Sequence, residues 1–285
     1  MDSDAVRELL LPRGIEAREI VRIEGGWASH TFEVDGEWIF RFPRNDEIAR
    51  SLEREIRLLP SLARAVSFAV PRFEFIGYYD DRLYAGYRKI EGVALDEIEL
   101  DDRLIEGVAR ALRELHDFPA SDARDVFGDP GTVDAWRDDY IRLREKAEIQ
   151  VRPLLDAATW NAVTIGFEQF LTDLDFSPAL VHRDLGMEHI LVDRESMSVT
   201  GIIDFEEAGV GDPVIDFVGL QIEFGDELVE RIAQEYGSAF DGAARERCKF
   251  YAWMGSVHAI FYGLETSRQS IVDDGVRVLP KRLGV

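Results

Sequence analysis

Short strand-like runs dominate the first ninety residues of the chain, after a short helix expected at residues 2–13. The five predicted strands cover residues 19–23, 30–34, 37–42, 70–77 and 82–88. Asp35-Gly36, between the second and third runs, is a strong signal for a hairpin turn. In the third run, alternation places Trp38 and Phe40 on one face and Arg41 on the other. The pattern therefore predicts five strands, with the second and third joined in a hairpin.

Apolar residues three or four positions apart indicate that most of the remaining chain is helical. A helix is expected at residues 45–64, with Asn45 or Asp46 as its cap and Ile48, Leu52, Ile56, Leu59 and Leu62 as its apolar stripe. Further helices are expected at residues 101–116, 135–146, 152–173 and, as the final core helix, 248–263. The aspartate-rich segment 121–139 is predicted to be largely a solvated loop, although it could also present carboxylates to a cationic ligand.

Three short apolar runs surround two acids and a histidine. These runs cover residues 179–181, 190–192 and 199–203. The triplet His182-Arg183-Asp184 follows the first run. His189 opens the second run, and Asp204 ends the third, twenty residues after Asp184. We therefore expect two acids and a histidine to converge at one edge of a hairpin.

This spacing fits phosphoryl transfer. Kinases use a loop of the form H-R-D-x-x-x-x-N, followed by a metal-binding aspartate on the next strand. The reaction needs one carboxylate to orient the attacking hydroxyl and take its proton, and oxygen ligands to hold Mg²⁺ against the phosphates. Asp184 suits the first task and Asp204 the second. Taken alone, the triplet is weaker evidence, because His182 could equally be a core histidine bonded to backbone.

The segments HRDLGMEHILVD and VTGIIDFEEAGVGDPVIDF resemble the antibiotic kinases. They are most similar to the aminoglycoside 2''-phosphotransferases and next to the macrolide phosphotransferases. The resemblance implies an α+β, two-lobed, protein-kinase-like fold. Residues 1–89 would form the nucleotide-binding lobe, a five-stranded antiparallel sheet with a helix, and residues 90–95 would form the hinge. Residues 96–285 would form a mainly helical lobe that carries the catalytic hairpin and the substrate site.

The nucleotide phosphates are expected to lie against the first turn of the sheet. Gly25 and Gly26 would let backbone N–H groups approach a phosphate, and Ser29 could add a hydroxyl, although a Gly-Gly pair is more often an ordinary turn. The resemblance places Arg41 where the family usually has a lysine that touches the phosphates. It makes Glu55 the partner of Arg41, whereas Glu55 could otherwise be an exposed helix residue.

The resemblance also assigns the base of the nucleotide to the hinge. The backbone of Arg88 and Ile90 would bind it, and Tyr87 would guard the back of the pocket. A tyrosine at this place in the aminoglycoside 2''-kinases goes with guanine, so GTP is favoured over ATP. A tyrosine merely packed in a strand would suit either base.

Acidic residues late in the chain are candidates for the acceptor site. In the family, a denser acidic cluster at this place holds substrate amines, and here Glu223, Asp226 and Glu227 correspond to it. The resemblance gives Asp216 a structural part, binding backbone near the catalytic loop. His189 stands where the kinase pattern has asparagine and would hold Mg²⁺ with Asp204, directly or through water, because imidazole is a poorer Mg²⁺ ligand than oxygen.

The chain of 285 residues carries a formal net charge of −23, which disfavours binding to nucleic acid or anionic membranes. Such a surface attracts a cationic small molecule, but it can also serve only solubility. One cysteine, Cys248, fits a reducing compartment, and neither a signal peptide nor an apolar run of the ~18 residues needed to span a membrane is visible. We expect a soluble, cytoplasmic monomer.

The leading hypothesis is a small-molecule kinase that moves the γ-phosphoryl group of GTP, or ATP, to a hydroxyl of an antibiotic, most simply an aminoglycoside. Asp184 would deprotonate the hydroxyl, with Mg²⁺ as cofactor. A macrolide kinase and a housekeeping sugar or amino-alcohol kinase are alternatives that use the same residues. Outside this class stand a phosphoester hydrolase with His182, Asp184, His189 and Asp204 as metal ligands, and an inactive binding module.

Overall fold

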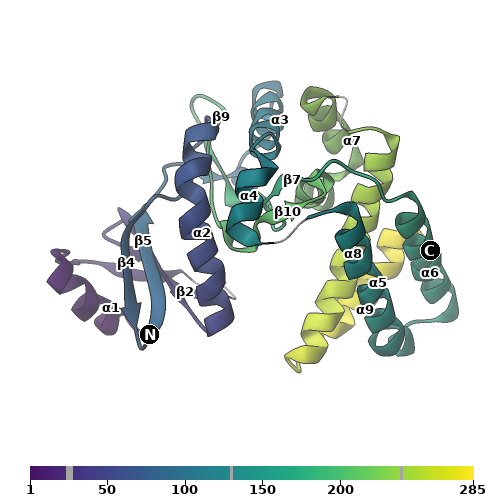
Figure 1. Cartoon of the computed structure of the whole chain (residues 1–285), viewed down its shortest axis with the longest axis horizontal. Helices are drawn as coiled ribbons and strands as arrows, with labels where there is room; N and C mark the ends of the chain where they lie inside the picture. The colour runs from purple at the N-terminus through teal and green to yellow at the C-terminus, as the bar shows by residue number, and fades with distance from the viewer. Residues whose placement is uncertain (24–27, 129–130, 238–239) are drawn as a thin grey trace. The chain divides into compact units, whose positions relative to one another are not determined.

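The five predicted strands form one antiparallel sheet in the computed structural model, which describes residues 1–23, 28–128, 131–237 and 240–285 (Figure 1). In spatial order the strands are β1 (Ile20–Ile23), β2 (Ser29–Val34), β3 (Trp38–Pro43), β5 (Arg82–Arg88) and β4 (Phe73–Tyr79). The β2–β3 turn is the expected one, because Asp35 and Gly36 both have positive φ.

The fourth strand begins three residues later than predicted. Ala69, just before the predicted start, bonds instead to a different segment: its N–H donates to the Thr200 carbonyl and its carbonyl accepts from Ile202. Pro71 follows and has no N–H to offer a sheet. The strand therefore starts at Phe73, where pairing with Tyr87 begins.

Backbone contacts divide the chain into two compact units, which are described separately. The first comprises Met1–Gly107, Asp125–Phe127 and Met187–Ala208, and the second comprises Val108–Arg124, Gly128–Gly186 and Gly209–Val285. These units do not test the predicted lobe boundary at residues 90–95, which stays a prediction. Among the described helices, none has the length and apolar character needed to cross a membrane.

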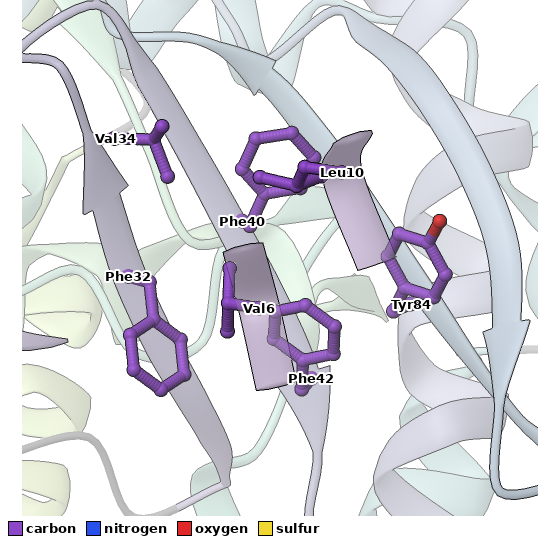
Figure 2. Close-up of a cluster of buried hydrophobic side chains, with 7 residues drawn as sticks. All are labelled: Val6, Leu10, Phe32, Val34, Phe40, Phe42 and Tyr84. Carbon is purple, nitrogen blue, oxygen red and sulfur yellow. The ribbon is translucent and has the colours of Figure 1, made fainter. Parts of the chain in front are cut away.

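An apolar cluster fills one face of the sheet under α1 (Ser3–Leu10), which continues into the short η1 (Leu11–Arg13). Figure 2 shows the cluster, formed by Val6, Leu10, Phe32, Val34, Phe40, Phe42 and Tyr84. The predicted alternation of β3 is confirmed, because Phe40 and Phe42 belong to this face. Packing is tight enough that a Cβ on Gly86 would lie 2.3 Å from the Phe40 ring.

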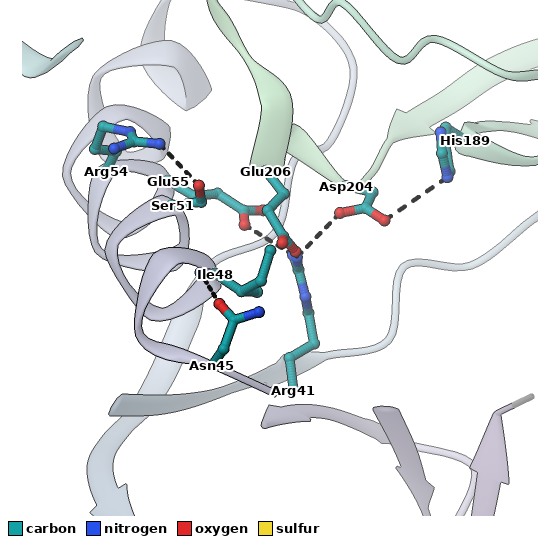
Figure 3. Close-up of polar contacts among 9 residues, drawn as sticks. All are labelled: Arg41, Asn45, Ile48, Ser51, Arg54, Glu55, His189, Asp204 and Glu206. Atoms are coloured by element: carbon teal, nitrogen blue, oxygen red, sulfur yellow. Dashed lines mark hydrogen bonds and ion pairs between the residues drawn. The ribbon is translucent and has the colours of Figure 1, made fainter. Parts of the chain in front are cut away.

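Helix α2 (Asp46–Ala65) contacts β3 and β5. Asn45 caps it by accepting a hydrogen bond of 3.0 Å from the Ile48 N–H, as the sequence predicted (Figure 3). Leu52 and Leu59 of the predicted stripe are buried. Glu55 is buried as well, so the alternative that it is an exposed helix residue is wrong. Helix α2 thus brings an acid to the side of β3 opposite the aromatic cluster.

The predicted hairpin forms in the first unit. Strands β8 (Ile190–Asp193) and β9 (Ser198–Ile202) pair antiparallel, and β8 also pairs with the short β6 (Val93–Ala94). The hairpin is framed by single helical turns, η4 (Met187–His189) before it and η5 (Phe205–Glu207) after it; a further turn, η2 (Leu95–Glu97), follows β6. Helix α2 contacts η5, so the end of the hairpin lies against the helix that carries Glu55.

The second unit is mainly helical and is built around α8 (Gly242–Glu265). That helix contacts α6 (Ala157–Asp173), α7 (Val218–Tyr236) and α9 (Gln269–Leu283). The remaining elements, in chain order, are α3 (Asp102–His116), which starts in the first unit, α4 (Ala120–Phe127), α5 (Val133–Gln150), η3 (Arg152–Leu154), β7 (Ala179–Val181), β10 (Gly209–Gly211) and η6 (Pro213–Phe217). Aromatic side chains fill the core, with Phe170 and Phe250 stacked at 3.8 Å.

Three helix predictions need correction. The segment expected to be a loop at 121–139 contains α4 and the start of α5, and α4 ends at Gly128, whose left-handed φ of 68° closes the helix. The helix predicted from residue 152 begins at Ala157, because Asp156 caps it by accepting from the Thr159 N–H. Helix α8 is not the final core helix, since α9 follows it with Val272 and Leu279 buried.

The fold class is confirmed. An N-terminal five-stranded antiparallel sheet with its helices is followed by a mainly helical region, as the α+β prediction requires.

Candidate active site

Arg41 is the centre of a buried charge cluster in the first unit (Figure 3). Its Nη1 lies 2.8 Å from Oε2 of Glu55, which confirms the predicted pair. Its Nη2 lies 3.0 Å from Oδ1 of Asp204 and donates a hydrogen bond to Oε2 of Glu206. One guanidinium group therefore joins strand β3, helix α2 and the end of the β8–β9 hairpin.

Asp204 is positioned by the β8–β9 register. Because Ile190 pairs with Ile202, the residues flanking that pair come together, and the Ile203 N–H donates to the His189 carbonyl. The Nε2 atom of His189 lies 3.7 Å from Oδ2 of Asp204. Asp204 adopts the left-handed conformation, with φ 66° and ψ 57°, which turns the chain sharply into η5. Its side chain is 44% exposed, so one side of the carboxylate remains open to a ligand.

The cluster carries more negative than positive charge. When all three acids are ionised, Arg41 leaves a net charge of two minus. Burial raises the pKa of Glu55 to about 7 and that of Glu206 to about 7, and Arg41 only partly opposes both shifts. Burial on its own would lower the pKa of Arg41, but the three carboxylates outweigh it and raise that pKa above its ordinary value.

The residues present suit a divalent cation that keeps other ligands. Among the described residues, no group of three or more His, Cys, Asp or Glu side chains is arranged to hold a metal. Mg²⁺ does not need such a cage, because it retains waters and uses one or two carboxylates together with substrate phosphates. The partly exposed carboxylate of Asp204 fits this type of site, because the cluster around it has a net charge of two minus when its three acids are ionised.

The loop that carries Asp184 is anchored by Asp216 in the second unit. The N–H groups of His182 and Arg183 donate to the Asp216 carboxylate, both at 2.8 Å, and Nε2 of His116 lies 3.1 Å from it. Asp216 and His182 are fully buried. The structural part predicted for Asp216 is thus confirmed, and a buried His182 fits the core-histidine alternative better than that of a metal ligand in a hydrolase.

Arg183 is held by several contacts, whereas the neighbouring Asp184 is an exposed residue. Arg183 has a positive φ of 69°, its Nη2 donates to the Val210 carbonyl at 2.8 Å, and its guanidinium lies over the Trp136 ring at 5.3 Å. Asp184, the next residue, has an exposed side chain. Its carbonyl accepts from the Gly186 N–H at 2.9 Å. The loop therefore presents the Asp184 carboxylate to solvent from a backbone held on both sides.

The structure describes some of the residues predicted to bind the nucleotide but not others. Gly25 and Gly26 lie outside the described residues. Ser29 is buried at the start of β2, and its hydroxyl has no hydrogen-bond partner in the described part of the chain. Tyr87 is buried opposite Ile39, and burial raises the pKa of its phenol, with Arg41 opposing the shift.

The two hinge residues occupy different surroundings. The exposed side chain of Arg88 lies over the Trp38 ring at 4.4 Å. The backbone of Arg88 stays the predicted contact for the nucleotide base. Ile90 is partly buried, and a Cβ on Gly201 would lie 2.7 Å from its side chain. Ile90 is thus packed against β9 of the β8–β9 hairpin.

The acids proposed for the acceptor lie on α7. Glu223, Asp226 and Glu227 are exposed, and Oδ1 of Asp226 accepts a hydrogen bond from Gln221. The helix is broken at Gly225, which has a φ of 77°, so Glu223 stands on one side of the kink and the other two acids on the other side.

The sequence interpretation gave no role to Glu206, although the structure places it on Arg41. A signal was present, because the motif reads Asp-Phe-Glu where a kinase has Asp-Phe-Gly, and arginine stands where lysine was expected. It also missed how Asp212, which caps η6 by accepting from the Val214 N–H, connects to α8. Its buried carboxylate accepts from Arg247 at 2.7 Å and from the Tyr251 hydroxyl at 2.8 Å, which ties η6 to α8.

Comparison with known proteins finds a matching family, a related sequence and similar structures. The model of the family described as "Phosphotransferase enzyme family" matches residues 19–251. The Bacillus subtilis (strain 168) protein YcbJ is 26% identical over 221 residues, which cover 71% of this chain and 68% of that protein. The structure of the GDP and kanamycin complex of APH(2'')-IIia is 28% identical, with a TM-score of 0.90 and 98% of each chain covered. A macrolide 2'-phosphotransferase type I is 22% identical, with a TM-score of 0.79 over 98% of this chain and 96% of that one, and shows the fold alone.

Proposed function

This chain belongs to the phosphotransferase enzyme family, and from that premise we propose that it transfers the γ-phosphoryl group of GTP to a hydroxyl of a cationic antibiotic, an aminoglycoside. The family confirms the resemblance drawn from the catalytic motifs. The choice of nucleotide and acceptor is supported by the similar APH(2'')-IIia, whose structure is a complex with GDP and kanamycin. ATP is the alternative donor.

In the proposed mechanism, Asp184 orients the acceptor hydroxyl and takes its proton. Its carboxylate is exposed, and Asp216 fixes the backbone immediately before it. Because the backbone before Asp184 is held, the positions that its exposed carboxylate can adopt are limited. Phosphoryl transfer depends mostly on such positioning.

Arg41 is proposed to steady the phosphates, with Glu55 holding the arginine in place. The backbone of Gly25 and Gly26 and the hydroxyl of Ser29 would add contacts, since the Ser29 hydroxyl has no partner among the described residues. Asp204, assisted by His189, would hold Mg²⁺. When bound, that ion would neutralise charge on the phosphates.

The guanine base and the acceptor are assigned to different parts of the sequence. We propose that residues 1–89 supply the nucleotide lobe and that the backbone of Arg88 and Ile90, with Tyr87 behind, binds guanine at the hinge of residues 90–95. Residues 96–285 would supply the acceptor side. There Glu223, Asp226 and Glu227 would attract substrate amines. The proposed location is the cytoplasm, and the proposed working form is a monomer.

The observation that carries this proposal is the Arg41 cluster, in which a buried cation pairs with Glu55 and touches an open acid at the end of the catalytic hairpin. Kanamycin and erythromycin should be offered to the purified protein with Mg²⁺ and either GTP or ATP, and phosphorylated product followed by mass spectrometry. Transfer to kanamycin with GTP is expected. Transfer to erythromycin alone would make it a macrolide kinase, and phosphate release without acceptor would favour the hydrolase.

A matched pair of variants assigns the base. Asp184→Asn should lower the transfer rate about 10²–10⁴-fold, the usual range for loss of a positioned acid or base. Its melting temperature should still rise with Mg²⁺ and GDP as in the unaltered protein, because ligand binding to the folded state stabilises it. Glu195→Gln, in the exposed turn between β8 and β9, should change neither quantity. A fully active Asp184→Asn protein would refute the assigned role.

A further inference from the structure

Glu206 is a buried acid that the mechanism above does not use. Its side chain is 7% exposed, and one of its oxygens accepts a hydrogen bond from Nη2 of Arg41 (Figure 3). Its other oxygen, Oε1, is buried without a hydrogen-bond partner among the described residues. Burying a carboxylate is unfavourable unless it is paired, so the contact with Arg41 stabilises Glu206 in its buried position.

The geometry of the pair depends on a forked cation. Nη1 of Arg41 serves Glu55, while Nη2 serves Glu206 and Asp204. Glu55 comes from helix α2 and Glu206 from η5, so the two acids hold the planar guanidinium from two separate elements. A lysine offers one nitrogen on a flexible stem and cannot reproduce this arrangement.

We propose that Glu206 is a positioning residue for nucleotide binding, and that arginine at position 41 and glutamate at position 206 function as a matched pair. Glu206 fixes Nη2 beside Asp204, so that the guanidinium and the open carboxylate keep a constant relative position for a metal-bound phosphate. Without Glu206, the acids that still contact Arg41 in the described part of the chain are Glu55 and Asp204, and the guanidinium can turn about its stem. This inference rests on the proposed nucleotide site.

The pairing makes a specific statement about lysine. In Arg41→Lys, one ammonium must serve Glu55, Asp204 and Glu206, and a buried acid is left poorly paired. Removing that acid as well, in Arg41→Lys/Glu206→Ala, relieves the defect. The double variant should therefore bind nucleotide better than Arg41→Lys alone, which is the opposite of two independent losses.

The test measures nucleotide and acceptor constants separately. Glu206→Gln and Glu206→Ala are expected to raise KM for Mg²⁺–GTP about tenfold or more, the range for a charge-assisted hydrogen bond, and to leave KM for the acceptor within about twofold. Calorimetric titration with Mg²⁺–GDP should give the same shift in Kd. Glu207→Gln is the matched control, because it removes an exposed charge from the same turn.

Each outcome has one meaning. The isosteric Glu206→Gln keeps the side-chain volume, so it remains informative if Glu206→Ala fails to fold. Unchanged nucleotide KM and Kd in folded Glu206→Gln, or equal effects in Glu207→Gln, would overturn the inference while the proposed function stands. An Arg41→Lys/Glu206→Ala protein that binds more weakly than both single variants would also overturn it. An unaltered protein that binds no nucleotide would overturn both.

Discussion

A single guanidinium group in the first unit is shared by three acids. Arg41 is buried with Glu55 and Glu206, while Asp204 reaches solvent. Burial raises the pKa of the two buried acids, Arg41 only partly opposes that rise, and the negative charge of Asp204 adds to it. A divalent cation at Asp204 would therefore lower both pKa values.

Replacement of Glu55 by glutamine should make the stability of the metal-free protein less dependent on pH. The pKa of Glu55 rises from 4.5 to about 7 on folding, so between these values the folded chain holds a proton that the unfolded chain has lost. The free energy of unfolding therefore falls as pH rises through this window. Glu55→Gln should remove on the order of 1–3 kcal/mol of that fall, measured by urea denaturation at about pH 5 and about pH 8 with EDTA.

The same slope in both proteins would mean that Glu55 is already ionised at about pH 5. Asp175→Asn provides a control, because Asp175 is an exposed acid in the second unit. Its replacement should leave the slope of the unaltered protein in place.

Asp204→Asn should remove the effect of Mg²⁺ on nucleotide binding. A neutral amide is a much weaker ligand than a carboxylate for a hard cation. In the unaltered protein, GDP should raise the melting temperature more with Mg²⁺ than with EDTA. In Asp204→Asn the two curves should coincide, and transfer should fall about 100-fold or more. A retained difference between Mg²⁺ and EDTA would place the ion elsewhere.

At the residue scale, the sequence predicted the contact of Arg41 with Glu55 but not its contact with Glu206. The Arg41–Glu55 pair was implied by the resemblance to the antibiotic kinases, and its two residues lie only 14 positions apart. Glu206 lies 165 residues from Arg41, and no periodicity links them. The departure from Asp-Phe-Gly was visible in the sequence, but its meaning required the β9 end and helix α2 to be placed together.

At the scale of elements, short irregular turns position the functional groups and regular elements hold the turns. The β8–β9 register brings His189 to Asp204, and η6 brings Asp216 to the backbone of the catalytic loop. The two oxygens of Asp216 accept hydrogen bonds from the N–H groups of His182 and Arg183. Its carboxylate therefore acts as a clamp between the catalytic loop and η6.

Asp216→Asn should loosen that clamp. An amide has one acceptor oxygen and places an NH₂ group where the second oxygen was, so one buried N–H of His182 or Arg183 loses its partner. The expected cost is about 2 kcal/mol of unfolding free energy. The rate of transfer should fall with little change in nucleotide affinity, because Asp184 rather than the nucleotide side is displaced. Urea denaturation and steady-state kinetics measure the two effects.

The matched control is Asp175→Asn, the exposed acid before β7. Equal stability of the Asp216→Asn and Asp175→Asn proteins would show that the loop does not depend on this carboxylate.

Element prediction succeeded where one signal dominated. The Asp35-Gly36 turn and the Asn45 cap were recognised because each fixes local backbone geometry. Helix α4 was missed because its aspartates suggested solvent, whereas Ala123 is buried and Gly128 ends the helix. Strand β4 starts late because Ala69 bonds to β9, a contact that local sequence does not reveal.

At the scale of the whole molecule, the net charge of −23 acts on any charged ligand. A field of this sign raises the local concentration of cations and lowers that of anions such as nucleotides. The chain thus favours a polycationic acceptor before any specific contact forms. Composition alone indicated this property, but it did not separate a role in substrate attraction from one in solubility.

Salt should therefore weaken acceptor binding in a way that depends on acceptor charge. Raising KCl from about 50 to about 300 mM shortens the screening length from about 14 Å to about 6 Å, so KM for the polycation kanamycin should rise about threefold to tenfold. Sucrose at matched osmolality should have no such effect. Comparing the unaltered protein with Glu223→Gln/Asp226→Asn/Glu227→Gln then separates two sources of attraction.

If the acids of α7 bind the acceptor directly, the triple variant should have a higher KM at low salt and a shallower salt dependence, because the exposed contacts that salt would screen are already gone. If the field of the whole surface is responsible, removing three of many acids should leave the slope nearly unchanged. A kanamycin KM that does not respond to salt in the unaltered protein would contradict both, and would leave the acidic surface with solubility as its role, because electrostatic attraction across solvent cannot escape screening.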